Sequence, residues 1–109
     1  MTAPFAVFLT AGAEADLADI HGWIAGHRGT DQAEAFLDHM LARVESLERF
    51  PNCGSVPAEL DTLGIREFRQ MGEQPYRLIY RVFGDHVFVL LIADGRRDFR
   101  SLIERRLLG

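Results

Sequence analysis

The alternation of apolar and polar residues along the chain predicts one strand, two helices, three further strands and a short terminal helix. Residues 5–10 are apolar almost throughout, with aromatic and β-branched members, which is typical of a strand in the interior of a sheet and not at its edge. Apolar residues then recur at helical spacing, first over residues 11–27 and again to about Arg49. Between Arg66 and Asp98 the period changes to two, which predicts three consecutive strands. A short helix is expected to follow, capped by the Asp98 carboxylate.

The two long helices are expected to pair as an antiparallel hairpin. Thr10 is placed to cap the start of the first helix, and Gly29 suits the cap at its end. Thr30 or Asp31 is expected to cap the second helix, with Glu34 in position for a capping box. Each helix carries one apolar stripe: Ala13, Leu17, Ile20 and Ile24, extended by Trp23, in the first, and Ala33, Phe36, Leu37, Met40, Leu41, Val44 and Leu47 in the second. The stripes allow both helices to pack on each other and on the sheet.

The middle strand of the predicted meander, residues 76–82, has two chemically different faces. Alternation places one set of side chains on one side of the sheet, namely Tyr76, Leu78, Tyr80 and Val82. The opposite side carries Arg77, Ile79 and Arg81. Short glycine-containing connections at 72–75 and 84–85 join this strand to its neighbours. We therefore expect an α+β fold with the helices on one face of the sheet, the aromatic side of the strand buried and its guanidinium side available to another macromolecule.

Cationic residues are concentrated in the second half of the chain. Residues 1–61 hold three arginines against ten carboxylates, a net charge of −7, whereas residues 62–109 hold nine arginines against six carboxylates, a net charge of +3. All twelve basic residues are arginine, which favours planar, bidentate recognition, although GC-rich coding explains it equally well. The overall charge of −4 argues against a general nucleic-acid coat. The candidate partner-binding residues are Arg66, Arg69, Arg77, Arg81, Arg96 and Arg97.

Length and composition are those of a small domain. A chain of 109 residues, of which 48% are hydrophobic, has room for one core, so residues 1–109 are expected to form a single domain. The longest apolar run, 87–93, is strand-sized, and the opening residues lack the basic flank of a signal peptide. We therefore expect a cytoplasmic protein without membrane contact. A single cysteine, Cys53, agrees with a reducing compartment.

No motif for enzyme chemistry stands out. The four histidines, His21, His27, His39 and His86, show no metal-ligand spacing with Cys53, so we expect no metal, and their roles stay open. There is no glycine-rich phosphate loop and no catalytic triad, so we expect no cofactor. The arginines allow two interpretations: they surround a phosphate during RNA cleavage, or they form ion pairs and receive acidic residues of a bound protein. We favour the second for Arg66, Arg69, Arg77 and Arg81.

Taken in order, the predicted elements and five short segments resemble the RelE/ParE toxin superfamily over essentially the whole chain. The segments are 47–54 (with Leu47, Phe50, Pro51 and Gly54), 66–69 (REFR), 76–82 (YRLIYRV), 95–98 (GRRD) and 103–108 (IERRLL). The resemblance implies the toxin of a bacterial type II toxin–antitoxin module, also described as a plasmid stabilisation protein. It further implies a cognate antitoxin whose flexible C-terminal segment wraps across the helices and the sheet.

The superfamily divides by target, and three features of this chain resemble the ParE branch more than the RelE branch. RelE-like members cut messenger RNA on the ribosome with lysines and arginines around the sheet, plus a tyrosine or histidine near the last strand or the C-terminus. This chain has no lysine, and its tail from Asp98 has neither tyrosine nor histidine. Asp94 stands where related chains often carry histidine, and its charge repels a phosphate.

The resemblance therefore implies a ParE-like inhibitor of DNA gyrase, without catalytic residues, that forms a hetero-oligomer with a ParD-like antitoxin. The alternative is a RelE-like endoribonuclease that acts on messenger RNA at the ribosome, with Arg69, Arg77 and Arg81 as the catalytic residues. A third possibility is a degenerate toxin that acts only with its antitoxin in transcriptional autoregulation.

Overall fold

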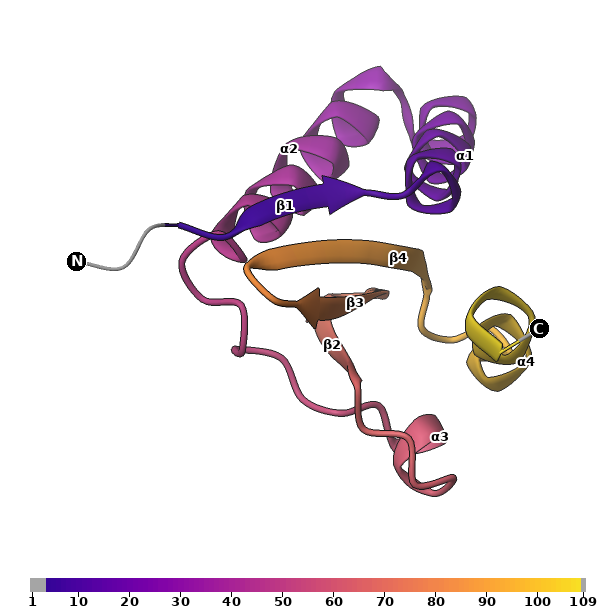
Figure 1. The fold of residues 1–109 in the computed structure, drawn as a ribbon. Helices are drawn as coiled ribbons and strands as arrows, with labels where there is room; N and C mark the ends of the chain where they lie inside the picture. Colours follow the sequence, from indigo (N-terminus) through magenta and orange to yellow (C-terminus); the bar gives the residue numbers. More distant parts are fainter. Residues whose placement is uncertain (1–3, 109) are drawn as a thin grey trace.

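The computed structural model describes residues 4–108 and places a four-stranded sheet between two layers of helices (Figure 1). The elements are β1 (Ala6–Leu9), α1 (Ala11–Arg28), α2 (Thr30–Ser46), α3 (Ala58–Asp61), β2 (Phe68–Glu73), β3 (Tyr76–Phe83), β4 (His86–Asp94), α4 (Phe99–Ile103) and the helical turn η1 (Glu104–Leu108). The strand order is β1-β4-β3-β2, with β1 parallel to β4 and the other neighbours antiparallel. The predicted α+β class, helix hairpin, meander and terminal helix are confirmed. Within residues 4–108, no helix is both long and apolar enough to cross a membrane.

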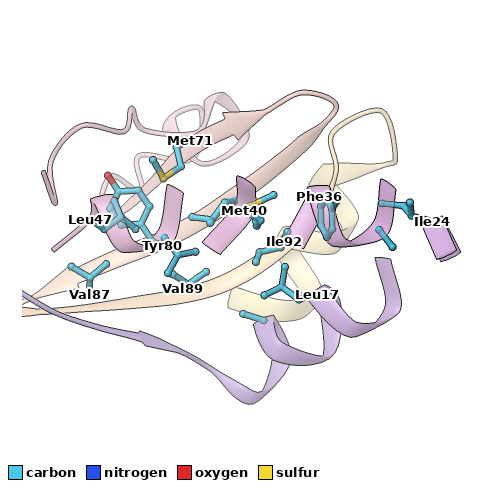
Figure 2. Packing of buried hydrophobic residues seen from close by; sticks show 14 residues of the cluster. Leu17, Ile24, Phe36, Met40, Leu47, Met71, Tyr80, Val87, Val89 and Ile92 are labelled. Atoms are coloured by element: carbon cyan, nitrogen blue, oxygen red, sulfur yellow. The ribbon is translucent and has the colours of Figure 1, made fainter. Parts of the chain in front are cut away.

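The long helices α1 and α2 cover one face of the sheet, and their apolar stripes form the larger core. Thr10 caps α1 as predicted, because its hydroxyl accepts a hydrogen bond from the Ala13 amide at 3.3 Å. Tyr80 of β3 is fully buried on this face, and Figure 2 shows its ring beside Leu47 and Met71. The aromatic side of the middle strand therefore seals the interior, as the alternation predicts.

The two short helices lie on the opposite face of the sheet (Figure 1). Helices on one face are thus observed for α1 and α2, while α3 and α4 cover part of the other face. The cause is a second apolar cluster centred on Ile79, the apolar member of the guanidinium side of β3. The cluster comprises Leu60, Phe68, Ile79, Leu91, Ala93, Phe99 and Ile103.

Strand β1 lies at an edge of the sheet, so the expectation of an interior strand is wrong. Its one strand neighbour is β4. Its apolar composition has another cause: Val7 and Leu9 pack toward the helices, while Phe8 on the other side stacks on Phe88 with ring centres 5.6 Å apart. Two half-covered faces require apolar residues as much as an interior position does.

The connection between α1 and α2 is shorter than expected. Gly29, at φ +101°, follows the last residue of α1 and directly precedes α2, which begins at Thr30. The predicted side-chain cap from Thr30 or Asp31 is therefore wrong, and no side chain caps α2. A positive φ at glycine lets the chain reverse within one residue, which leaves no room for a separate cap.

Candidate functional site

Arg69 lies on the helix side of the sheet, where it fixes the segment that follows α2. Its guanidinium donates to the carbonyl oxygens of Gly54 at 2.7 Å and Asn52 at 3.3 Å. In return, the Gly54 amide donates to the buried Tyr80 hydroxyl at 2.9 Å. Burial raises the pKa of Tyr80 to about 12. These contacts hold a loop against the sheet and leave Arg69 committed to backbone oxygens.

Arg77 lies on the opposite side, sandwiched between α3 and α4. It makes a bidentate ion pair with Glu59, at 2.7 and 3.0 Å, and its Nε donates to the Gln70 side chain at 2.9 Å. The guanidinium carbon also lies 3.9 Å from the ring centre of Phe99. Hydrogen bonds from Arg77 lower the pKa of Glu59 below its ordinary value. Arg77 therefore joins three elements of this layer to one another.

Arg66 and Arg81 each face a carboxylate of their own neighbourhood. Arg66 pairs with Asp61 at 2.9 Å, and its side chain is 71% exposed. Arg81 lies 3.6 Å from Glu67 and over the ring of Phe83, at 5.5 Å. Exposed pairs of this kind are weak, so a partner can displace them.

The three arginines of the alternative interpretation, in which guanidinium groups surround a phosphate, do not come together. Register pairs Arg69 with Tyr80 and Phe68 with Arg81, and directly paired residues share a face of a sheet. Arg69 thus faces the helices, while Arg77 and Arg81 face the other layer. A phosphate cannot contact all three guanidinium groups across the thickness of the sheet.

A pocket of about 370 Å³ opens between α1 and the end of β4, and it contains the remaining candidate arginines. Asp94 ends β4 and holds Arg96 by two contacts, at 3.0 and 2.6 Å, which lower the pKa of the Asp94 carboxyl. Arg97 is exposed, and among residues 4–108 no carboxylate lies within ion-pair distance of it. The apolar part of the lining includes the aromatic side chains of Trp23 and Tyr76. The pocket thus combines aromatic surface with two arginines, Arg28 and Arg97, that make no ion pair within residues 4–108.

The comparison with protein families gives one match over most of the chain. The sequence model of the ParE toxin of the type II toxin–antitoxin system, parDE, matches residues 7–99. The chain belongs to the ParE toxin family. Among curated proteins, none matches the sequence.

Two solved structures resemble this ParE-family chain in fold. One is from the chromosomal ParDE toxin–antitoxin system of P. aeruginosa, with a TM-score of 0.70 and 22% identity, covering 83% of this chain and 95% of that chain. The other is from the toxin–antitoxin complex RelBE2 of Mycobacterium tuberculosis, with a TM-score of 0.56 and 20% identity, covering 86% of this chain and 94% of that chain. At these identities the likeness shows a shared fold.

The sequence pattern of this ParE-family chain did not identify Trp23 as a candidate functional residue. The structure places it in the pocket wall, where it is 51% exposed. Trp23 was grouped with the buried stripe of α1. Its position directly before the buried Ile24 was the available signal, because adjacent helical residues point about 100° apart. Trp23 instead stacks on His27, with ring centres 4.3 Å apart, and lies 5.8 Å from the Arg28 guanidinium carbon.

Asp16, which was not among the candidate residues, joins α1 to the C-terminal turn η1. Its carboxylate accepts two hydrogen bonds from Arg106, at 2.9 and 3.0 Å, and one from the Ile92 amide at 2.9 Å. Arg106 also donates to the carbonyl of Leu90, the residue of β4 skipped where the register with β3 shifts. Such contacts between distant segments leave no periodic signal in a sequence.

Proposed function

We propose that this chain is a non-enzymatic toxin that inhibits DNA gyrase and is neutralised by a cognate antitoxin. Membership of the ParE toxin family supports the class. The observation that carries the mode of action is the separation of Arg69 from Arg77 and Arg81 on opposite faces of the sheet. A nuclease that stabilises charge on a scissile phosphate needs its cations preorganised around one point. A chain that acts by binding has no such requirement.

The pocket beside Trp23 is the surface proposed for antitoxin contact. Aromatic residues and arginine are enriched where proteins bind one another, and this pocket provides Trp23, Tyr76, Arg96 and Arg97 at one place. Arg97 is able to receive an acidic side chain without breaking an internal ion pair. The two structural neighbours come from ParDE and RelBE2 toxin–antitoxin systems, which supports an antitoxin as partner.

The test of the mode of action is a supercoiling assay with purified gyrase and relaxed plasmid. Stoichiometric toxin is expected to abolish supercoiling, and the product of the adjacent antitoxin reading frame is expected to restore it. Translating ribosomes with a defined messenger serve as the second arm, and the messenger should stay intact. Normal supercoiling together with codon-phased cuts that disappear in Arg81→Ala would replace the proposal with the endoribonuclease.

A pair of arginine variants tests the surface. Arg97→Glu is expected to weaken the complex with the antitoxin by roughly tenfold or more, because a charge reversal at an interface adds repulsion to the lost attraction. Arg66→Glu is the control, since Arg66 is also exposed but lies beside α3, outside the lining of the pocket. Equal affinities for the two variants would exclude the pocket as the antitoxin site.

A further inference from the structure

A second pocket, of about 320 Å³, lies between α1, the end of β4 and the C-terminal turn η1 (the Arg105 pocket). Figure 1 shows α4 and the end of the chain beside the end of β4. The lining contains three guanidinium groups, those of Arg97, Arg105 and Arg106, against one carboxylate, that of Asp16. The charged groups of the lining therefore carry a net charge of +2, in a chain whose overall charge is −4.

The one carboxylate of the lining neutralises Arg106 and leaves the other two arginines uncompensated. Asp16 accepts two hydrogen bonds from Arg106, at 2.9 and 3.0 Å, and a third from the Ile92 amide at 2.9 Å. Within residues 4–108, neither Arg97 nor Arg105 makes an ion pair. The positive charge of the pocket is therefore that of Arg97 and Arg105.

Two further carboxylates close in sequence to these arginines bind other donors. Asp94 holds Arg96 by contacts of 3.0 and 2.6 Å. Asp98 caps α4 and accepts from the Ser101 amide at 3.3 Å and from its hydroxyl at 2.7 Å. Neither carboxylate lines the pocket. An anion that neutralises the pocket has to come from outside the described part of the chain.

The two uncompensated guanidinium groups have donors to offer such an anion. Each guanidinium carries five N–H donors in a fixed fork. Arg105 directs its Nε toward the Ser101 carbonyl, at 3.5 Å, and both arginines are exposed to solvent. Like charges that line one pocket repel each other, so an anion bound between them gains attraction to both and removes the repulsion.

We infer that the Arg105 pocket binds a terminal phosphate group, either as free phosphate or as a phosphomonoester. Such a group carries a charge of about −1.5 to −2 at pH 7 and three acceptor oxygens, which matches two uncompensated arginines. Guanidinium forks bind phosphate oxygens in a bidentate manner, so each arginine can take its own pair of oxygens. The volume lies at the lower end of the roughly 300–1,000 Å³ of small-ligand sites, so an organic group attached to the phosphate also has room.

Charge and the number of oxygens distinguish this ligand from two others. A carboxylate of a partner protein brings one charge and two oxygens, which one arginine fork already satisfies. A nucleic-acid backbone brings one charge per phosphate and would run past Asp98 and Glu104, the exposed carboxylates at the two ends of α4. The terminal phosphate alone neutralises both arginines without meeting these carboxylates.

The inference is independent of the proposed antitoxin contact. Arg97 lines both the Trp23 pocket and the Arg105 pocket, whereas Arg105 lines the second alone. A variant of Arg105 therefore tests phosphate binding without altering the lining of the Trp23 pocket. Phosphate binding and antitoxin binding can thus fail separately.

The first test titrates the full chain with inorganic phosphate and with phenyl phosphate, at constant ionic strength and above the second phosphate pKa of about 6. NMR signals of the arginine Nε–H groups and of the backbone amides are followed. Saturable shifts are expected for Arg97, Arg105 and the amides of residues 91–93. Tighter binding of phenyl phosphate would identify a phosphomonoester as the ligand, and tighter binding of inorganic phosphate the free ion; both support the inference.

Acetate and dimethyl phosphate, which carry a single charge, are the control ligands. Each is expected to bind at least about tenfold more weakly than the two dianions, because it loses a charge-assisted contact. Equal binding of either control ligand, or shifts that do not saturate with phosphate, would overturn the inference.

Arginine variants test the site itself. Arg105→Gln and Arg97→Gln are each expected to weaken phosphate binding by about tenfold or more, since each removes charge-assisted hydrogen bonds. Arg49→Gln is the matched control, because Arg49 is also exposed, makes no ion pair within residues 4–108 and does not line the pocket. An unchanged spectrum of the buried residues verifies folding in all three variants. Unchanged phosphate affinity in Arg105→Gln, or an equal loss in Arg49→Gln, would exclude the pocket as a phosphate site.

Discussion

At the scale of single residues, the fully buried Tyr80 links the core to the loop that follows α2. Its hydroxyl accepts a hydrogen bond from the Gly54 amide, and that approach is so close that a Cβ at position 54 would lie 2.7 Å from the hydroxyl oxygen. Glycine is thus required at position 54 for steric reasons. Arg69 completes the arrangement by donating to the Gly54 carbonyl. One side chain of the sheet therefore positions a segment that has little regular structure of its own.

Replacing Tyr80 tests this link. Tyr80→Phe leaves the Gly54 amide without its acceptor and is expected to lower the free energy of unfolding by about 1–2 kcal/mol. Tyr80→Ala also leaves a cavity and is expected to lower it by about 3 kcal/mol. Denaturant titration measures both losses. A Tyr80→Ala loss below about 0.5 kcal/mol would contradict the burial of the ring.

The raised pKa of Tyr80 predicts that the stability of the folded chain decreases at alkaline pH. The pKa of Tyr80 rises from 10.0 in the unfolded chain to about 12 in the folded one. The unfolded chain therefore releases this proton first, and the stabilisation, complete below pH 10.0, is lost as the pH rises toward about 12. Tyr80→Phe lacks this proton, so its free energy of unfolding does not change with this titration. The difference in free energy of unfolding between the wild type and Tyr80→Phe should therefore become smaller over that range. A constant gap would contradict the shift.

At the scale of elements, the layer opposite the long helices is held together by Arg77 of β3. Glu59 belongs to α3 and Phe99 to α4, and both contact the same guanidinium. Gly95 permits this packing, because a Cβ there would lie 2.8 Å from Arg77 Cδ. The short helices, of four and five residues, are too brief to be stable alone and depend on these contacts.

Glu59→Gln is expected to lower the free energy of unfolding by about 1–2 kcal/mol at neutral pH, because it removes the charge from a half-buried bidentate pair. The pKa of Glu59 lies below its ordinary value of 4.5, so the stabilisation is present above pH 4.5 and is lost as the pH falls through the lower folded value. The difference in free energy of unfolding between Glu59→Gln and the wild type should therefore disappear at acid pH. Glu67→Gln is the matched control: its pair with Arg81 is longer and more exposed, so its effect should stay within about 0.5 kcal/mol. Equal losses from the two variants at neutral pH would contradict a special role for Arg77.

The elements themselves could largely be predicted from the sequence, because periodicity and caps are local. Thr10 and Asp98 cap their helices as expected, with hydrogen bonds of 3.3 Å to Ala13 and to Ser101. The place of β1 in the sheet could not be predicted, since apolar residues that pack on both sides resemble an interior strand. The partners of the arginines could not be predicted either. Glu59, the partner of Arg77, comes from a segment without periodicity. Arg69 and Arg81 lie on opposite faces because of the register of β2 against β3, which the periodicity of each strand does not reveal.

At the scale of the whole molecule, the acidic first half and the basic second half of the chain meet at one internal contact. Asp16 of α1 binds Arg106 of η1, 90 residues away in sequence, and both lie beside β4. Gly12 lets the guanidinium cross the first turn of α1, because a Cβ there would lie 2.7 Å from Arg106 Nη1. The contact joins the long-helix layer to the C-terminal turn. It also occupies backbone groups of β4 beyond the point where β1 ends, so that part of the β4 edge is closed to an added strand.

Removing this contact should loosen the junction between the two layers. The Asp16 side chain is only 15% exposed and accepts three hydrogen bonds, so Asp16→Asn is expected to lower the free energy of unfolding by about 2 kcal/mol. It should also speed exchange of the Ile92 amide, whose acceptor it weakens, more than exchange of the buried amides of β3. Asp19→Asn, one turn further along α1 at an exposed position, removes the same charge without an ion-pair partner among residues 4–108 and is expected to change neither quantity. If both variants lost the same stability, the effect would come from the net charge of α1, and the junction between α1 and η1 would have to be held by apolar packing alone.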